Sequence, residues 1–140
     1  MNNQKFIFIV LIVILTEILF ITHCSDSTSN SEGTLEGKWL LTKVTTTTPL
    51  GSYSENPAEE GYTVRLTINN DNTYTVVEAD ESGSEVTNGT WSKSGNTLTI
   101  VDGDDVREVE YDLDGDKLRI SFEEEYQGVT GTITQEFTRQ

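Results

Sequence analysis

The sequence of 140 residues carries 24 Asp and Glu residues against 9 Lys and Arg residues, which gives a net charge of −15 at pH 7. This length suggests a single domain. The negative charge argues against binding to nucleic acid and against electrostatic attachment to anionic lipid. The one histidine, His23, and the one cysteine, Cys24, are adjacent. The residues after them offer no disulfide, no thiol nucleophile and no Ser/His/Asp set, so we predict a protein that is not an enzyme and holds no metal or cofactor.

The N-terminal residues have the organisation of an export signal. Residues 1–5 carry one positive charge, and residues 6–22 form an apolar run that Thr16 and Glu17 interrupt. A positive start, an apolar segment and a cleavage site together direct export. Because Cys24 follows this run, the pattern resembles a bacterial lipoprotein signal, although the residues just before the cysteine are unusual for one. The resemblance implies that residues 1–23 are a signal peptide and that Cys24 is acylated.

An acylated Cys24 would attach the protein to a membrane. Two or more acyl chains, such as palmitate, give stable anchoring, whereas one chain gives only marginal binding. The resemblance therefore implies a lipid-anchored protein of the bacterial cell envelope, in the outer membrane rather than the inner. Two alternatives stay open: an uncleaved membrane helix over residues 6–22, or ordinary secretion. Residues 24–34 are predicted to be the lipidated cysteine and a flexible polar tether, and residues 35–140 the folded domain.

The first strand of the folded domain is predicted over residues 35–48. Trp39 and Leu41 alternate with outward-facing residues, which is the spacing of a strand, and β-branched threonines follow up to Pro49. The next residues, 49–61, contain two prolines and two glycines and are predicted to be the longest loop of the domain. Loops of this length are often functional.

Alternating apolar residues predict seven further strands, separated by clusters of Asn, Asp and Gly that favour turns. These strands cover residues 62–69, 74–79, 86–91, 98–101, 109–113, 118–123 and 132–138. Regularly spaced short strands without helices indicate a sandwich or a barrel. Sequential hairpins favour up-and-down order, and closure removes exposed edges. We therefore predict an all-β, eight-stranded antiparallel up-and-down barrel.

One face of the predicted strands carries most of the large apolar side chains. The inward set is Trp39, Leu41, Tyr62, Val64, Leu66, Ile68, Tyr74, Val76, Trp91, Leu98, Ile100, Tyr111, Leu118, Ile120, Phe122, Ile133 and Phe137. An eight-stranded barrel is either filled by such side chains or holds one small ligand. The sequence leaves both versions open.

Clusters of acidic residues are the remaining candidates for chemistry. Asp102, Asp104 and Asp105, and the pair Asp114 and Asp116, suggest a calcium ion, but their spacing does not match the calcium-binding loop of about twelve residues. Asp-Gly pairs are also preferred hairpin turns. The run of glutamates at residues 123–125 lies on a predicted strand, where neighbouring side chains face opposite sides. We interpret these clusters as turns and a solvated face, with no metal site.

Two stretches of the folded domain resemble lipocalins. Gly37-Lys38-Trp39 resembles the Gly-x-Trp signature of the first lipocalin strand. Residues 89–100, Gly-Thr-Trp-Ser-Lys-Ser-Gly-Asn-Thr-Leu-Thr-Ile, resemble a hairpin of small bacterial lipocalin-like lipoproteins, and residues 136–139 are similar to their closing strand. The resemblance covers the chain from about residue 35 to its end. It implies that Gly37, Trp39 and Trp91 are structural residues at an end of the barrel.

The lipocalin resemblance also implies that the protein binds a small hydrophobic ligand. The predicted ligand-binding residues are Leu50, Tyr53, Tyr62, Tyr74, Tyr111 and Phe122, and the tyrosine hydroxyls would orient a small apolar or aromatic molecule. The protein is expected to be a monomer whose cavity opens near Leu50 and Tyr53. The alternative is a surface interaction module, adhesin-like or inhibitor-like, with a filled barrel and no small-molecule ligand.

Overall fold

The computed structural model describes residues 33–126 and 128–140, so Cys24, the predicted signal peptide and most of the predicted tether lie outside the described residues. The described residues form strands joined by turns. The strands are β1 (Gly37–Thr48), β2 (Gly51–Glu55), β3 (Thr63–Ile68), β4 (Thr73–Asp80), β5 (Gly83–Ser94), β6 (Thr97–Asp102), β7 (Asp105–Asp114), β8 (Lys117–Tyr126) and β9 (Val129–Arg139). Within these ranges, no helix is long and apolar enough to cross a membrane.

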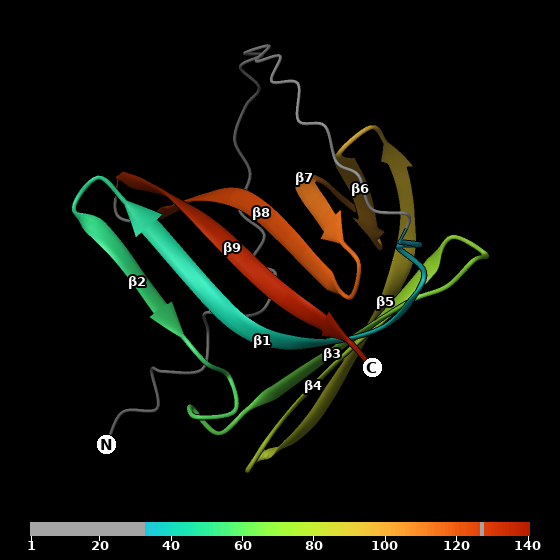
Figure 1. The fold of residues 1–140 in the computed structure, drawn as a ribbon, viewed down its shortest axis with the longest axis horizontal. Helices are drawn as coiled ribbons and strands as arrows, with labels where there is room; N and C mark the ends of the chain where they lie inside the picture. Colours follow the sequence, from blue (N-terminus) through green and yellow to red (C-terminus); the bar gives the residue numbers. More distant parts are fainter. Residues whose placement is uncertain (1–32, 127) are drawn as a thin grey trace.

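The strands form one antiparallel sheet that closes on itself (Figure 1). From β3 to β9 each strand pairs with the next one in the chain, and β1 pairs with β3 along one edge and with β9 along the other. These eight strands make an up-and-down barrel, which confirms the predicted fold class. The sequential order follows from the short turns, because antiparallel neighbours can be joined by tight hairpins.

The ninth strand, β2, corrects the prediction that residues 49–61 form a loop. It folds back on the second half of β1, and the pairing runs from Val44 opposite Glu55 to Thr48 opposite Gly51. Two hydroxyl pairs join the strands: Thr45 Oγ1 lies 2.9 Å from Ser54 Oγ, and Thr47 Oγ1 lies 3.0 Å from Ser52 Oγ. Such cross-strand hydroxyl contacts stabilise a sheet without apolar residues, which is why the hydrophobic pattern does not reveal β2.

A β-bulge in β1 changes which side chains face the interior. Leu41 pairs with Phe137 and Lys43 pairs with Glu136, so Thr42 is an extra residue between two paired positions. The Thr42 hydroxyl donates to the main-chain oxygen of Glu136, 3.1 Å away. A one-residue insertion shifts the two-residue alternation of a strand. Val44 is consequently buried, and strict alternation from Trp39 and Leu41 does not predict this.

The core occupies the barrel interior and contains every member of the predicted inward set, either buried or packed against the buried side chains. The buried members of this core cluster outside that set are Leu35, Val44 and Val109. Leu35 is almost fully buried although it precedes β1, because its main-chain oxygen accepts a hydrogen bond of 2.9 Å from the indole Nε1 of Trp39. The segment before the first strand thus covers one end of the barrel.

The first and last strands meet at this covered end. The guanidinium of Arg139 lies over the Trp39 ring, 4.1 Å from its centroid, and Arg139 Nη1 donates to the main-chain oxygen of Glu36 over 3.0 Å. Gly37 has a φ of 145°, and a Cβ there would lie 2.4 Å from Arg139 Nη1. Glycine is therefore the residue that lets Arg139 reach Trp39.

Candidate functional site: a cavity inside the barrel

The barrel contains a cavity of about 140 Å³ that is partly open to solvent. Strands β3 to β9 all contribute to its wall. The lining residues are Val64, Leu66, Ile68, Tyr74, Val76, Glu78, Thr87, Trp91, Leu98, Ile100, Arg107, Val109, Ile120, Phe122, Gln135 and Phe137. Apolar side chains dominate this set, so the cavity offers an apolar surface to a bound molecule.

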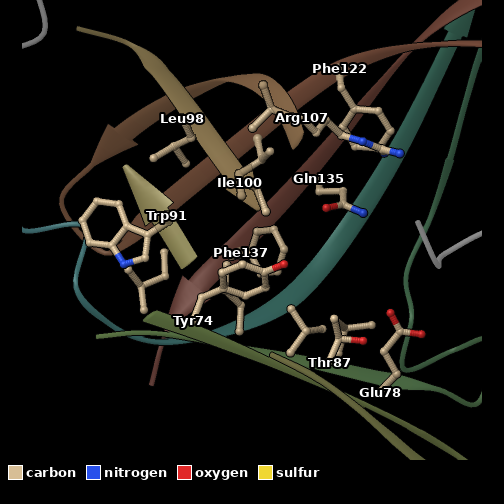
Figure 2. Close-up of a pocket in the computed structure, with 16 residues that line it drawn as sticks. Tyr74, Glu78, Thr87, Trp91, Leu98, Ile100, Arg107, Phe122, Gln135 and Phe137 are labelled. Atoms are coloured by element: carbon tan, nitrogen blue, oxygen red, sulfur yellow. The ribbon is translucent and has the colours of Figure 1, made fainter. Parts of the chain in front are cut away.

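The strand pairing explains why the wall is incomplete on one side. β5 pairs with β4 from Gly83 to Thr90, but its pairing with β6 begins only at Thr90. The first half of β5 therefore has one described neighbour in the sheet. Thr87, in this half, is one of the residues that line the cavity (Figure 2).

Four polar side chains lie on the cavity wall: Glu78, Thr87, Arg107 and Gln135 (Figure 2). Glu78, Arg107 and Gln135 are each two residues from an apolar lining residue (Val76, Val109 and Phe137), and Thr87 is four residues from Trp91, so all four occupy inward positions of their strands. Alternation with a period of two brings them to the inner face. Sequence reasoning missed these polar residues because it kept only apolar residues in the inward set, although the same alternation would have found them.

Tyr74 places a polar atom deep in the cavity. Its side chain is 5% exposed, its ring lies among the lining residues, and its hydroxyl points into the space between them (Figure 2). The hydroxyl is buried without a hydrogen-bond partner. Burial raises the pKa of Tyr74, and the negative charge of Asp102 adds to this. The phenol is thus a neutral hydrogen-bond donor. Buried polar groups of native proteins nearly always have a hydrogen-bond partner.

A glycine makes room for the Tyr74 ring. Gly89 is the cross-strand partner of Tyr74, and a Cβ at this position would lie 2.7 Å from Tyr74 Cε1 and 2.2 Å from the main-chain oxygen of Val101. Because these approaches are closer than van der Waals contact, the packing of β4, β5 and β6 here needs a residue without a side chain.

Glu78 and Arg107 bring opposite charges to the wall. Burial raises the pKa of the Glu78 carboxyl, and repulsion from Glu85, its cross-strand partner, raises it further. The Arg107 guanidinium lies 5.9 Å from the centroid of the Phe122 ring. Of the ion pairs found in residues 33–126 and 128–140, none includes Arg107. Its N–H donors are therefore not occupied by a carboxylate of the described chain.

The structure separates the predicted ligand-binding residues into three groups. Tyr74 and Phe122 line the cavity. Tyr62 and Tyr111 pack against the core but do not line the cavity. The Tyr62 hydroxyl donates to Glu55 Oε1 over 2.8 Å, and burial together with this bond raises the pKa of Tyr62. The Tyr111 hydroxyl donates to the main-chain oxygen of Gly95 over 3.1 Å.

The third group, Leu50 and Tyr53, lies on the β1–β2 hairpin, far from Trp39: Leu50 is in the turn after β1, and Tyr53 is on β2 opposite Thr46. These side chains are 92% and 62% exposed, and neither lines the cavity. The barrel-end residues Gly37 and Trp39 lie at the covered end described above, and Trp91 lines the cavity while its indole Nε1 donates to the main-chain oxygen of Asn69 over 3.1 Å.

No cluster of three or more His, Cys, Asp or Glu side chains in the described part of the chain is placed to hold a metal ion. The acidic turns are built as hairpins. Asp102 and Asp105 pair across the β6–β7 turn, and Asp114 pairs with Lys117 across the β7–β8 turn.

Comparison with known proteins identifies the family of this barrel. The family model of the lipocalin-like domain matches residues 35–120, which is more than half of the chain. The chain therefore belongs to the lipocalin-like domain family. No curated protein matches the sequence. A lipocalin-like protein from Bacteroides uniformis has a similar structure, with a TM-score of 0.52 and 18% identity over 76% of this chain and 98% of that chain. The siderocalin Ex-FABP gives a TM-score of 0.44 with 18% identity, covering 76% of this chain and 70% of that one.

Proposed function

We propose that the protein is a lipid-anchored binding protein of the bacterial envelope that holds one small apolar molecule inside its barrel. The observation that carries the proposal is the cavity, because apolar side chains from seven successive strands surround a space that is partly open to solvent. Membership of the lipocalin-like family supports it. A cavity with an apolar wall and a few convergent polar groups is the usual form of a small-molecule site.

The volume of the cavity limits the size of the ligand. Sites for drug-sized molecules have about 300–1,000 Å³, whereas this cavity has about 140 Å³. An engineered cavity of about 150 Å³ in another protein binds benzene. The buried part of the ligand is therefore about as large as one six-membered ring, and a longer molecule would extend through the open side.

Anchoring through Cys24 is the second part of the proposal. It is supported by the order of a positive start, an apolar run and a cysteine in residues 1–24. If it is correct, the protein remains in the membrane fraction after a high-salt wash. The variant Cys24→Ala has no thiol to acylate and therefore lacks the mass of the acyl chains. Intact-mass measurement then decides: a mass that equals the unmodified, uncleaved chain would contradict lipid attachment.

A surface interaction module is the second candidate, and one observation favours it. Leu50 and Tyr53 are apolar side chains exposed together on the β1–β2 hairpin. In this case the hairpin and the acidic surface would contact a protein partner, and the cavity would have no ligand.

Native mass spectrometry of the protein isolated from its own cells tests the main proposal. We expect an additional mass of a small molecule that is lost under denaturing conditions. A bare mass that does not change after incubation with benzene-sized and fatty-acid-sized probes would contradict ligand binding and would favour the interaction module.

A further inference from the structure

We infer that the cavity selects a compact carboxylate: a molecule with an apolar body of about one ring and one anionic group, which Arg107, Gln135 and Tyr74 bind. The inference rests on the proposed function and adds the charge of the ligand to it. It follows from the hydrogen-bonding groups of the cavity wall that have no partner within the described chain.

Unused donors on the wall are the first step. The Tyr74 hydroxyl is buried and has no hydrogen-bond partner. Arg107 contacts the face of the Phe122 ring, and no ion pair of the described residues engages it. A guanidinium has five N–H donors in one plane, which suit a carboxylate. Because ring contact leaves the edge of the guanidinium free, Arg107 and Tyr74 together call for a ligand that accepts hydrogen bonds.

The arrangement of polar and apolar side chains is the second step. In Figure 2 the Arg107 guanidinium and the Gln135 amide lie near Phe122, whereas Trp91 and Leu98 lie at the other side of the cavity. Arg107 and Val109 are on the same face of β7, and two residues of a strand span about 6.7 Å. This separation suits a ring that contacts Val109 and Leu98 with its carboxylate directed to Arg107.

Glu78 is the group that would oppose an anion. It faces the cavity from β4, and its cross-strand neighbours are Val64 of β3 and Glu85 of β5. Burial raises the pKa of Glu78, and Glu85 raises it further. Glu78 therefore loses its negative charge at a higher pH than an ordinary carboxyl does. Arg107 cannot lose its charge at any ordinary pH. Arg107 therefore keeps a positive charge on the cavity wall at every ordinary pH, even though the whole protein is strongly negative.

Calorimetric titration of the full chain in detergent micelles tests the inference with three probes that share one ring: benzoate, benzyl alcohol and benzylamine. Titration into empty micelles is subtracted. We expect benzoate to bind at least about tenfold more tightly than the other two, since hydrogen bonds to a charged group contribute more than neutral ones. Arg107→Gln should weaken the binding of benzoate at least about tenfold and leave the binding of benzyl alcohol unchanged.

Two further variants separate a specific contact from a general charge effect. Arg65→Gln removes the same charge from an exposed, outward position of β3 and should leave benzoate binding unchanged. Tyr74→Phe keeps the ring but removes the hydroxyl. It should weaken the binding of benzoate several-fold while the variant stays folded. Should Arg107→Gln not fold, the order of the three probes on the unmodified protein still decides.

Several results would overturn the inference. They are equal binding of benzoate and benzyl alcohol, tightest binding of benzylamine, or equal losses in the Arg65 and Arg107 variants. If benzyl alcohol binds and benzoate does not, the cavity is a neutral site and only this inference fails. If none of these probes binds, the proposed function fails with it.

Discussion

At the scale of single residues, the hydroxyl of Tyr74 has opposite effects on binding and on stability. In the free protein it is buried without a partner, and such a group costs about 1–3 kcal/mol. We expect Tyr74→Phe to raise the free energy of unfolding by about 1 kcal/mol. Tyr111→Phe is the matched control. It removes a hydroxyl that donates to Gly95 and should lower stability by about 1 kcal/mol. Urea unfolding of both variants checks this, and a loss in Tyr74→Phe would contradict it.

Glu78 makes stability depend on pH. Its pKa in the folded protein is raised above the ordinary value of 4.5, first by burial and then by Glu85. Such a carboxyl contributes most to the stability of the fold below pH 4.5, its ordinary pKa. This stabilisation is lost as the pH rises through the pKa of the folded protein. Glu78→Gln should therefore raise the melting temperature at pH 7 and have little effect at pH 4.

Thermal melts across this pH range test the role of Glu78. Glu108→Gln is the control, because it removes the same charge from an exposed, outward position of β7. If both variants change the melting temperature equally at pH 7, the net charge is responsible and not the environment of Glu78.

The polar residues of the cavity show how far sequence reasoning reaches at this scale. Alternation predicted the apolar wall correctly except for Val109, and Val64, Leu66 and Ile68 face inward as expected. The same alternation places Glu78 and Gln135 on the inner face, but the predicted inward set was limited to apolar residues and so left them out. The partner of a buried polar group is not visible in the sequence, because it depends on which strands lie opposite each other.

At the scale of elements, β2 differs from the eight strands of the barrel. It pairs only with β1 in the described sheet, and its side chains are exposed except for the half-buried Glu55. A strand with one neighbour and no core contacts opens locally at low cost. We expect amides of residues 51–55 to exchange with deuterium much faster than those of residues 133–139.

Hydrogen exchange followed by mass spectrometry measures this difference directly. Equal protection of the two segments would show that another surface covers β2. The threonine-rich second half of β1 serves as an internal control, because β9 pairs with it on the other edge.

Two elements escaped sequence reasoning for different physical reasons. β2 consists of glycine, serine, tyrosine and glutamate, and its pairing rests on hydroxyl contacts that leave no hydrophobic period. The bulge at Thr42 breaks the period inside a strand, so Val44 was assigned to no face. The number, order and closure of the eight barrel strands were predicted correctly because turns of Asn, Asp and Gly separate regular apolar alternation elsewhere.

At the scale of the whole molecule, charge repulsion acts against the compact barrel. The net charge is −15, and the ion pairs of the described residues join exposed or half-buried groups, which contribute little. Salt screens repulsion between charges, with a Debye length of about 30 Å at 0.01 M and about 3 Å at 1 M. We expect the melting temperature at pH 7 to rise with sodium chloride.

Thermal melts at increasing salt test this expectation, and the same series at acidic pH is the control. Protonation of the carboxylates removes the repulsion there, so the effect of salt should largely vanish. A melting temperature independent of salt at pH 7 would show that the acidic side chains are too far apart to interact.

The pairing of β1 with β9 has a consequence for how the protein is made. Arg139 joins the covered end through Trp39 and Glu36, and the main-chain N–H of Gln140 donates to the oxygen of Lys38 over 2.9 Å. Contacts between residues about a hundred positions apart form slowly, since the intervening chain must first be brought together. β9 is synthesised after the other eight strands, so a growing chain holds an open sheet whose first strand still lacks its second neighbour. Closure of the barrel is therefore the last step in the assembly of the sheet.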